Sequence, residues 1–188
     1  TILRQTTRPV LNAGIAAAHM ARASLAAWPV AWGFAILIAG PAWSLQQLTT
    51  ALALDELAYR RVRVFALSLS GFFTCVLAVV AFTPLYGQVM GGIYNLSPEL
   101  QELARPALQL MSVYPLLLGA QSLLRGVSIL AGNTAVVRSA MTVNVLTLAV
   151  MVLAGVWLFS LSGVLVAAIA VLAGAVAELA WLFWRRGS

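Results

Sequence analysis

Five long apolar segments constrain what this chain can fold into more than any other feature of its sequence. They cover about residues 26–54, 64–86, 106–124, 139–159 and 164–184. An α-helix rises about 1.5 Å per residue, so about 20 apolar residues suffice to cross a hydrocarbon core about 30 Å thick. Because each segment is about that long or longer, we expect an all-α fold, a polytopic bundle of transmembrane helices.

The composition excludes a soluble globular domain. Hydrophobic residues make up 62% of the chain and charged residues only 9%, whereas a soluble domain carries about 25% charged residues. The net charge of +6 is compatible with nucleic-acid binding, but the sequence has no basic stripe, no zinc-ligand spacing and no recognition-helix pattern. We therefore expect no nucleic-acid partner and take the lipid bilayer as the surroundings of the chain.

The placement of the arginines predicts the orientation of the helices. Arg125 and Arg138 flank a short turn that contains Gly and Asn, between the third and fourth segments. Loops with several arginines face the cytoplasm, and three such loops, 55–63, 125–138 and 185–186, fall on one side if the helices alternate. We therefore expect a multi-pass protein of the inner (cytoplasmic) membrane with a cytoplasmic C-terminus. Arg125 and Arg138 either anchor this topology or contact an anionic headgroup or substrate phosphate.

The N-terminal stretch, residues 1–25, leaves two alternatives open. Its Ala-rich sequence is interrupted by Arg4, Arg8, His19 and Arg22. This pattern fits either a short first spanning helix or an amphipathic helix at the membrane interface. With the helical lobe at 26–186, the bundle therefore has five helices, or six with the N-terminal one. Because the chain opens on Thr1 rather than methionine, we expect it to be a piece of a longer protein or the ordered part of one.

Several short elements follow one another between residues 60 and 184. They are the acidic loop Leu96–Leu100, the mid-membrane Pro115, Leu124-Arg125-Gly126, Ala131-Gly132-Asn133-Thr134, Asn144 and the run 163–170. In this order they resemble the multidrug-and-toxin-extrusion (MATE) transporters and the wider superfamily of polysaccharide and lipid-linked oligosaccharide flippases. The resemblance covers the second half of one six-helix lobe, so it implies one lobe of a two-lobe transporter.

The resemblance implies an exporter or flippase that moves a small amphipathic or lipid-linked substrate by alternating access. A second homologous lobe, in the same chain or from a dimer partner, would complete the substrate cavity. The resemblance also implies coupling to H+ or Na+ and no other cofactor. No enzyme is expected, and the sequence contains neither HExxH nor Gly-x-Ser-x-Gly. The first segment has no carboxylate before Asp55 to match the family's cation site, so that site lies in the missing lobe or this chain does not couple in that way.

Polar residues inside the apolar segments are the candidates for a transport site, because transport needs polar groups at membrane depth. The candidates are Gln46, Gln47, Thr49 and Thr50 in the first segment and Asn144 in the fourth. They either line a substrate cavity or hydrogen-bond between helices. Pro41 and Pro115 interrupt the first and third segments, as hinges for alternating access or as static kinks.

Glu178 is the only carboxylate in a predicted span. It either binds a coupling proton or cation, or lies near the cytoplasmic interface and pairs with Arg185 or a loop arginine. The same segment carries small residues four apart, in the pairs Ala170/Gly174 and Ala173/Ala177. Such pairs favour close helix packing inside the chain, with dimerisation as the alternative.

The remaining candidates are assigned to structure. An interfacial belt accounts for the tryptophans, including Trp28, Trp32, Trp181 and Trp184. His19 and Cys75 lack the partners that a metal or nucleophilic site needs. The competing hypothesis to a transporter is a non-transporting membrane subunit that anchors or assembles a partner. The scarcity of buried charge favours this anchor, and the Pro, Gln and Thr interruptions argue against it.

Overall fold

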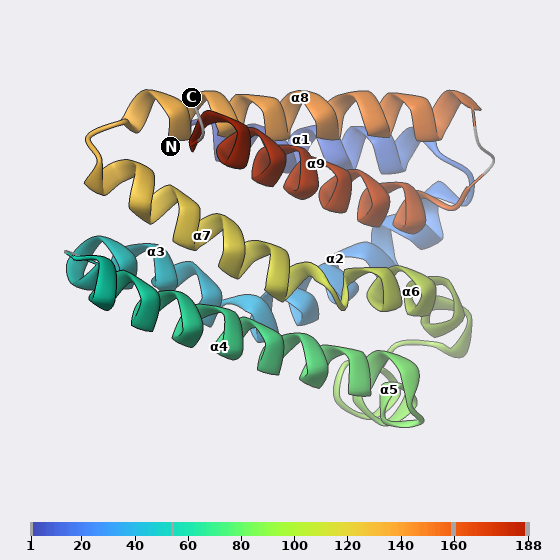
Figure 1. The fold of residues 1–188 in the computed structure, drawn as a ribbon. Coiled ribbons are helices and arrows are strands. Elements are labelled where there is room, and N and C mark those ends of the chain that lie inside the picture. Colours follow the sequence, from blue (N-terminus) through green and yellow to red (C-terminus); the bar gives the residue numbers. More distant parts are fainter. Residues whose placement is uncertain (1, 54, 159–160, 187–188) are drawn as a thin grey trace.

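The computed structural model describes residues 2–53, 55–158 and 161–186. The described residues form an all-α bundle without strands, which confirms the predicted fold class (Figure 1). Its elements are α1 (Ile2–Ala17), α2 (Ala21–Ala39), α3 (Pro41–Leu52), α4 (Glu56–Phe82), α5 (Leu85–Gly87), a π-helical turn (Gln88–Ile93), α6 (Pro98–Met111), α7 (Tyr114–Leu130), α8 (Thr134–Leu158) and α9 (Gly163–Arg186).

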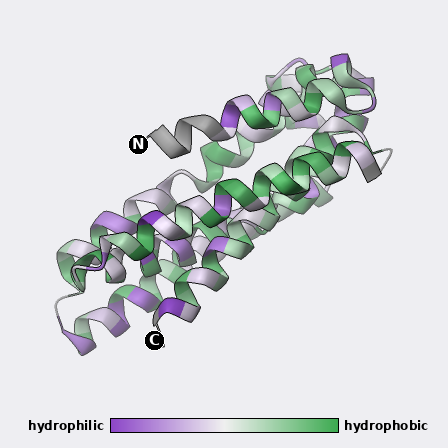
Figure 2. Ribbon diagram, turned by 90° about the horizontal axis from the view of Figure 1, so that it is seen from above, coloured by the Kyte–Doolittle hydropathy of each residue, from purple (hydrophilic) through white to green (hydrophobic). Residues whose placement is uncertain are grey.

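Five helical stretches of the described chain are long and apolar enough to cross a membrane. They are Ala21–Leu52, Glu56–Phe82, Pro98–Leu130, Thr134–Trp157 and Gly163–Arg185. Figure 2 shows hydrophobic residues along the helices from end to end. The five stretches correspond to the five apolar segments of the sequence, and they indicate a multi-pass membrane protein.

Several arginines lie inside helices, although the sequence predicted them in loops. We expected Arg60, Arg61 and Arg63 in a charged loop, but they belong to the first turns of α4. The helix starts early because the Asp55 side chain accepts a hydrogen bond from the backbone N–H of Ala58 at 2.7 Å, which caps its N-terminus. The start of this helix, predicted from the charged residues alone, was therefore placed several residues too late.

The turn between α7 and α8 is also shorter than expected. The predicted hairpin spans 125–138, but α7 continues to Leu130 and α8 begins at Thr134. Gly132 has a positive φ of 72°, a conformation that glycine adopts without steric cost and that commonly ends a helix. Arg125 is therefore inside α7, and Arg138 lies in the first turns of α8.

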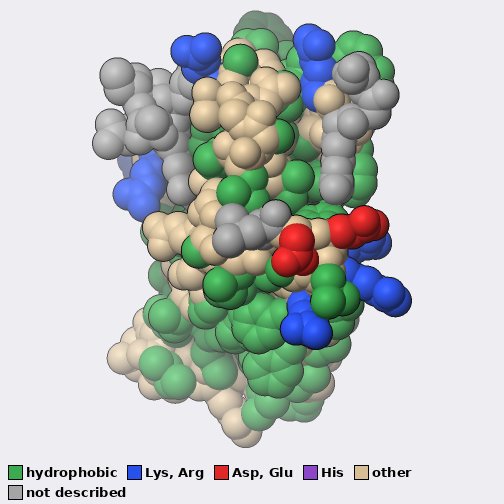
Figure 3. All heavy atoms as spheres, turned by 60° about the vertical axis from the view of Figure 1, so that its left-hand side comes forward, with side chains coloured by type: hydrophobic (Ala, Val, Ile, Leu, Met, Phe, Trp, Pro, Cys, Tyr) green, Lys and Arg blue, Asp and Glu red, His purple; other side chains and the backbone are tan. Residues whose placement is uncertain are grey.

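The helix ends nevertheless group as the arginines predicted. The α3–α4 connection, the α7–α8 turn and both chain termini lie at one end of the bundle (Figure 1). Figure 3, turned to bring this end forward, shows several arginine side chains there. The α1–α2 and α8–α9 connections lie at the opposite end. The helices thus alternate in direction, as a multi-pass topology requires.

Helix α1 runs along the bundle and not across one of its ends. It packs beside α8 and α9, and the backbone N–H of Gly163 at the start of α9 donates to the carbonyl of His19 just after α1 at 3.3 Å. The 16 residues of α1 extend about 24 Å. Helix α1 is not among the five stretches that are long and apolar enough to cross a membrane, and both alternatives for residues 1–25 stay predictions.

Close helix contacts depend on glycine at a few positions. A Cβ on Gly126 of α7 would lie 2.6 Å from the Cβ of Thr49 and 3.0 Å from the carbonyl oxygen of Gln46, both on α3. A Cβ on Gly174 of α9 would lie 3.0 Å from the carbonyl oxygen of Asn144 on α8. The small residues of α9 therefore serve packing inside the chain at this position.

We expect Gly126→Val to destabilise the bundle by about 1–3 kcal/mol, because the added side chain must push α7 away from α3. Gly71→Val is the matched control, since a Cβ at Gly71 on α4 meets nothing within 4 Å. Denaturant unfolding in a mild detergent measures both variants. Equal stability of the two variants would contradict the close α3–α7 contact.

Tyr86 in α5 provides a pH-dependent contact beyond the spanning helices. Its hydroxyl donates to the carbonyl oxygen of Gln101 at 2.6 Å. Burial raises the pKa of this phenol from 10.0 to about 12, although the nearby Arg105 lowers it. The folded state therefore favours the neutral phenol, and this contribution to stability is complete below pH 10 and is lost as the pH rises towards 12. We expect the phenolate absorbance that Tyr86→Phe removes to appear with a midpoint near pH 12.

Candidate functional site

Two of the spanning stretches are broken, each next to a proline that the sequence singled out. Pro41 is the first residue of α3, directly after the α2–α3 break at Gly40. Pro115 is the second residue of α7, after the break that follows Met111 at the end of α6. Proline lacks a backbone N–H and fits the first turn of a helix, which explains why each new helix begins there.

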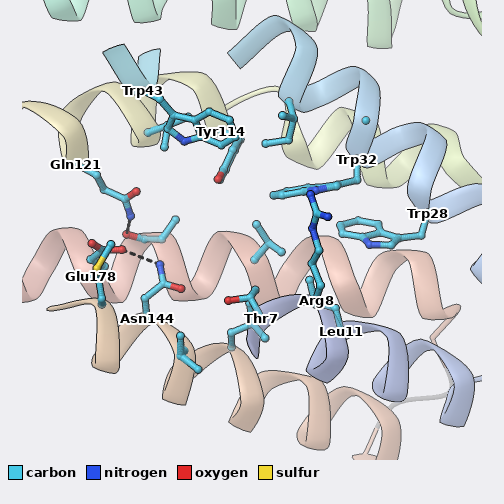
Figure 4. Close-up of a pocket in the computed structure, with 18 of the residues that line it drawn as sticks. Thr7, Arg8, Leu11, Trp28, Trp32, Trp43, Tyr114, Gln121, Asn144 and Glu178 are labelled. Carbon is cyan, nitrogen blue, oxygen red and sulfur yellow. Dashed lines mark hydrogen bonds between the residues drawn. The ribbon is translucent and has the colours of Figure 1, made fainter. Parts of the chain in front are cut away.

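A cavity of about 800 Å³ lies between α1, α2, α3, α7, α8 and α9 (Figure 4). Five of its described lining residues are exposed, namely Arg8, Asn12, Pro29, Gly33 and Trp43. Its volume is in the range of sites that bind small molecules. The cavity therefore lies within this single bundle, whereas the family resemblance implies a cavity between this bundle and a second lobe.

Aromatic side chains form one wall of the cavity. The rings of Trp28 and Trp32 on α2 stack with centroids 5.5 Å apart, and Trp32 contacts Tyr114 of α7 at 5.6 Å. Trp43 of α3 also lines the cavity. The expectation that Trp28 and Trp32 belong to an interfacial belt is therefore wrong, because Trp28 is only 4% exposed and both rings face the cavity. A stacked aromatic wall binds planar or apolar groups.

The other two tryptophans that the sequence assigned to the belt lie at the arginine end of the bundle. Trp181 and Trp184 belong to the last turns of α9, at the arginine end of the bundle. The Arg185 guanidinium lies 5.2 Å and 5.3 Å from their ring centroids. Such amphipathic rings with a cation beside them are typical of a membrane–water boundary.

A buried ion pair forms the polar wall of the cavity. Nε of Arg125 on α7 donates to Oε1 of Glu178 on α9 at 2.6 Å, and its Nη2 also contacts that oxygen. The amide of Asn144 on α8 donates to Oε2 of Glu178 at 2.8 Å. Glu178 is 0% and Arg125 7% exposed. The network thus joins α7, α8 and α9 through one carboxylate whose two oxygens both have donors.

Gln121 extends this polar wall by one helical turn. Its amide donates to the carbonyl oxygen of Ala175 on α9 at 2.8 Å (Figure 4). Gln121 and Arg125 are four residues apart on α7 and both are buried, so they lie on the same face of the helix. A helix face with two buried polar residues is unusual at membrane depth and generally marks a functional surface.

The structure changes the assignment of Glu178 and Arg125. Glu178 pairs with Arg125, one of the arginines that the sequence placed in the 125–138 loop, and not with Arg185. The interpretation of Arg125 as a topology anchor at a loop is wrong, because α7 continues past it to Leu130 and buries its guanidinium beside Glu178. Arg138 is exposed near the start of α8, where a topology anchor belongs. Asn144 lines the cavity and makes an interhelical hydrogen bond to Glu178, which is the interhelical alternative; a substrate contact by Asn144 stays a prediction.

The four polar residues of the first segment lie away from the cavity. Thr49 is buried against α7, and its hydroxyl donates to the carbonyl of Leu45 at 2.7 Å. Thr50 donates to the carbonyl of Gln47 at 2.8 Å. None of Gln46, Gln47, Thr49 and Thr50, all within the described chain, lines the cavity. They therefore do not contribute to this cavity, because this part of α3 faces α7 or the surface, and a substrate-binding role for them stays a prediction.

The sequence analysis also missed a set of residues from α1. Thr7, Arg8, Leu11 and Asn12 line the cavity. Their spacing places them on one face of a helix, a signal that was present in the sequence. It was overlooked because the N-terminal stretch had no assigned position, and its arginines were treated only as interruptions.

No metal centre is evident at the cavity. The described residues contain no group of three or more His, Cys, Asp or Glu side chains that could hold a metal ion. A coupling cation at Glu178 would have to displace Arg125 or Asn144 from its two oxygens.

Comparisons with known proteins identify no relative. No protein-family model, no curated protein and no solved structure matches the chain. What the chain does is therefore argued from the cavity itself.

Proposed function

We propose that this chain is a membrane transporter of the MATE or flippase type, which binds a small amphipathic substrate in the cavity and moves it by alternating access. The observation that carries the proposal is one cavity with a stacked aromatic wall and a buried ion pair on the opposite side. Aromatic rings suit the apolar part of an amphipathic molecule, and ionisable groups inside a membrane bundle are generally functional.

The aromatic wall is connected to both helix breaks. Trp43 follows Pro41 by two residues, and Tyr114 directly precedes Pro115. A ligand held against these rings therefore contacts the residues at which α3 and α7 begin. Broken helices recur at transporter sites, where they allow parts of a bundle to tilt. On this proposal, substrate binding changes the relative orientation of the helices on either side of each break, so the two breaks act as hinges.

The ion pair supplies the second element of the mechanism. Glu178 joins α7 to α9 through Arg125 and to α8 through Asn144. Loss of the attraction between Glu178 and Arg125 would loosen the three helices at the cavity wall. We therefore assign ion coupling, by H+ or Na+, to Glu178. The arginine end is assigned to the cytoplasm, and a second lobe, from the same chain or a dimer partner, completes the transporter.

Cysteine labelling along α8 tests this proposal. Val145 lines the cavity, whereas the adjacent Leu146 is 60% exposed on the outer surface of the bundle. Each is replaced by Cys after removal of the native thiol with Cys75→Ala, and vesicles are treated with a membrane-impermeant thiol reagent from either side. A transporter predicts that Val145→Cys reacts from both sides, whereas Leu146→Cys in lipid reacts from neither.

The same experiment separates the transporter from the anchor subunit. A static anchor has no reason to open its interior to both compartments in turn. Absence of reaction at Val145→Cys, or reaction from one side only, would therefore contradict alternating access. Equal reaction at Val145→Cys and Leu146→Cys would contradict the cavity itself.

A further inference from the structure

Positive and negative side chains line the cavity in unequal numbers. Arg8, Arg125 and Glu178 are the charged side chains of the described lining, so one net positive charge remains. Arg125 and Glu178 satisfy each other, and both Glu178 oxygens have donors. No ion pair joins Arg8 to a carboxylate of the described residues. Among the described lining residues, the uncompensated charge therefore belongs to Arg8.

Arg8 lies beside the aromatic wall. Figure 4 shows its side chain extending from α1 toward Trp32. Thr7 and Asn12 line the cavity from the same helix, and they add a hydroxyl and an amide that can donate hydrogen bonds. A guanidinium with neighbouring donors binds a carboxylate, sulfonate or phosphate. The apolar surface next to it is the stacked pair Trp28–Trp32.

We propose that the cavity selects amphipathic anions, with the anionic group at Arg8 and a planar apolar body on Trp28 and Trp32. This inference rests on the proposed function, since it names the substrate class of the same cavity. Glu178, the one carboxylate of the described lining, is already neutralised by Arg125, so a cationic amphiphile finds no unpaired counter-charge there. The anionic group comes either from a free small molecule or from a lipid headgroup.

Two probes with the same ring and opposite charge test the selection. Binding of naphthoate and of naphthylmethylammonium is measured by equilibrium dialysis against the protein in phosphatidylcholine nanodiscs, with empty nanodiscs as blank. We expect naphthoate to bind about tenfold more tightly than the cation. Arg8→Gln removes this preference, Arg8→Lys keeps it and Arg8→Glu reverses it. Arg22→Gln is the matched control, because Arg22 is exposed on α2 and does not line the cavity; it leaves both affinities unchanged.

Trp32→Ala separates failure of this inference from failure of the proposed function. If both probes bind equally and both weaken with Trp32→Ala, the cavity binds ligands but the charge selection is overturned. If Trp32→Ala changes neither affinity, the cavity is not a binding site and both proposals fail. Phosphatidylglycerol in the nanodiscs identifies the source of the anion. Competition with naphthoate supports a lipid headgroup as the occupant, and absence of competition supports a free anionic amphiphile.

Discussion

Replacing Glu178 with leucine is expected to destabilise the bundle by about 3–5 kcal/mol, because it leaves the Arg125 guanidinium buried without its counter-charge. Arg125 is 7% exposed, and an arginine side chain does not neutralise itself by releasing its proton. Asn144 loses its acceptor in the same variant. Unfolding in a mild detergent, followed by helical circular dichroism, measures the loss.

Arg125→Met provides the internal comparison. It leaves a buried carboxylate, which can become neutral by binding a proton, so its cost is smaller than that of an unpaired guanidinium. Glu102→Leu makes the same change as Glu178→Leu at an exposed site on α6, and we expect a change within about 0.5 kcal/mol. If Glu178→Leu is no more destabilising than Glu102→Leu, the ion pair is not buried as the structure has it.

Most of the fold follows from the sequence, because lipid leaves the chain few options. Without water to satisfy backbone groups, a long apolar segment must be helical, and the five segments became five apolar helical stretches. Arginine placement gave the grouping of the helix ends for a similar reason, since charges avoid the hydrocarbon. Helix boundaries were less certain, because Asp55 caps α4 before its arginines and Gly132 ends α7 only after Arg125.

The site was only partly predictable, because each span was judged without its neighbours. Glu178 and Asn144 were recognised as polar residues at membrane depth, and both lie at the cavity. Arg125 was misassigned because a charge near a segment end normally reaches water. Only the approach of α9 shows that its partner is 53 residues away along the chain. Gln46 and Thr49 were expected at a cavity and lie away from it, because polarity alone does not reveal which face of α3 meets α7.

Replacing the whole polar network by apolar residues is expected to restore stability and abolish alternating access. In the triple variant Arg125→Met, Asn144→Leu and Glu178→Leu, no member of the network is left unpaired. Buried ion pairs exchanged for apolar residues of similar volume are often neutral or stabilising, by about 1–4 kcal/mol. We therefore expect the triple variant to be at least as stable as the native chain, and about 3–5 kcal/mol more stable than Glu178→Leu.

The same variant separates a structural network from a functional one. If the ion pair is a switch, an apolar wall locks α7, α8 and α9 in one arrangement, and Val145→Cys in the triple variant reacts with the impermeant reagent from one side only. Gly71→Val in the same cysteine background is the control, because a Cβ at Gly71 meets nothing within 4 Å, and we expect it to retain labelling from both sides. A stable triple variant that still reacts from both sides would show that the network holds the helices together without operating the cavity. Charge at membrane depth is costly. If the triple variant is as stable as the native chain, stability does not explain the ion pair, and a change of state that apolar residues cannot undergo does.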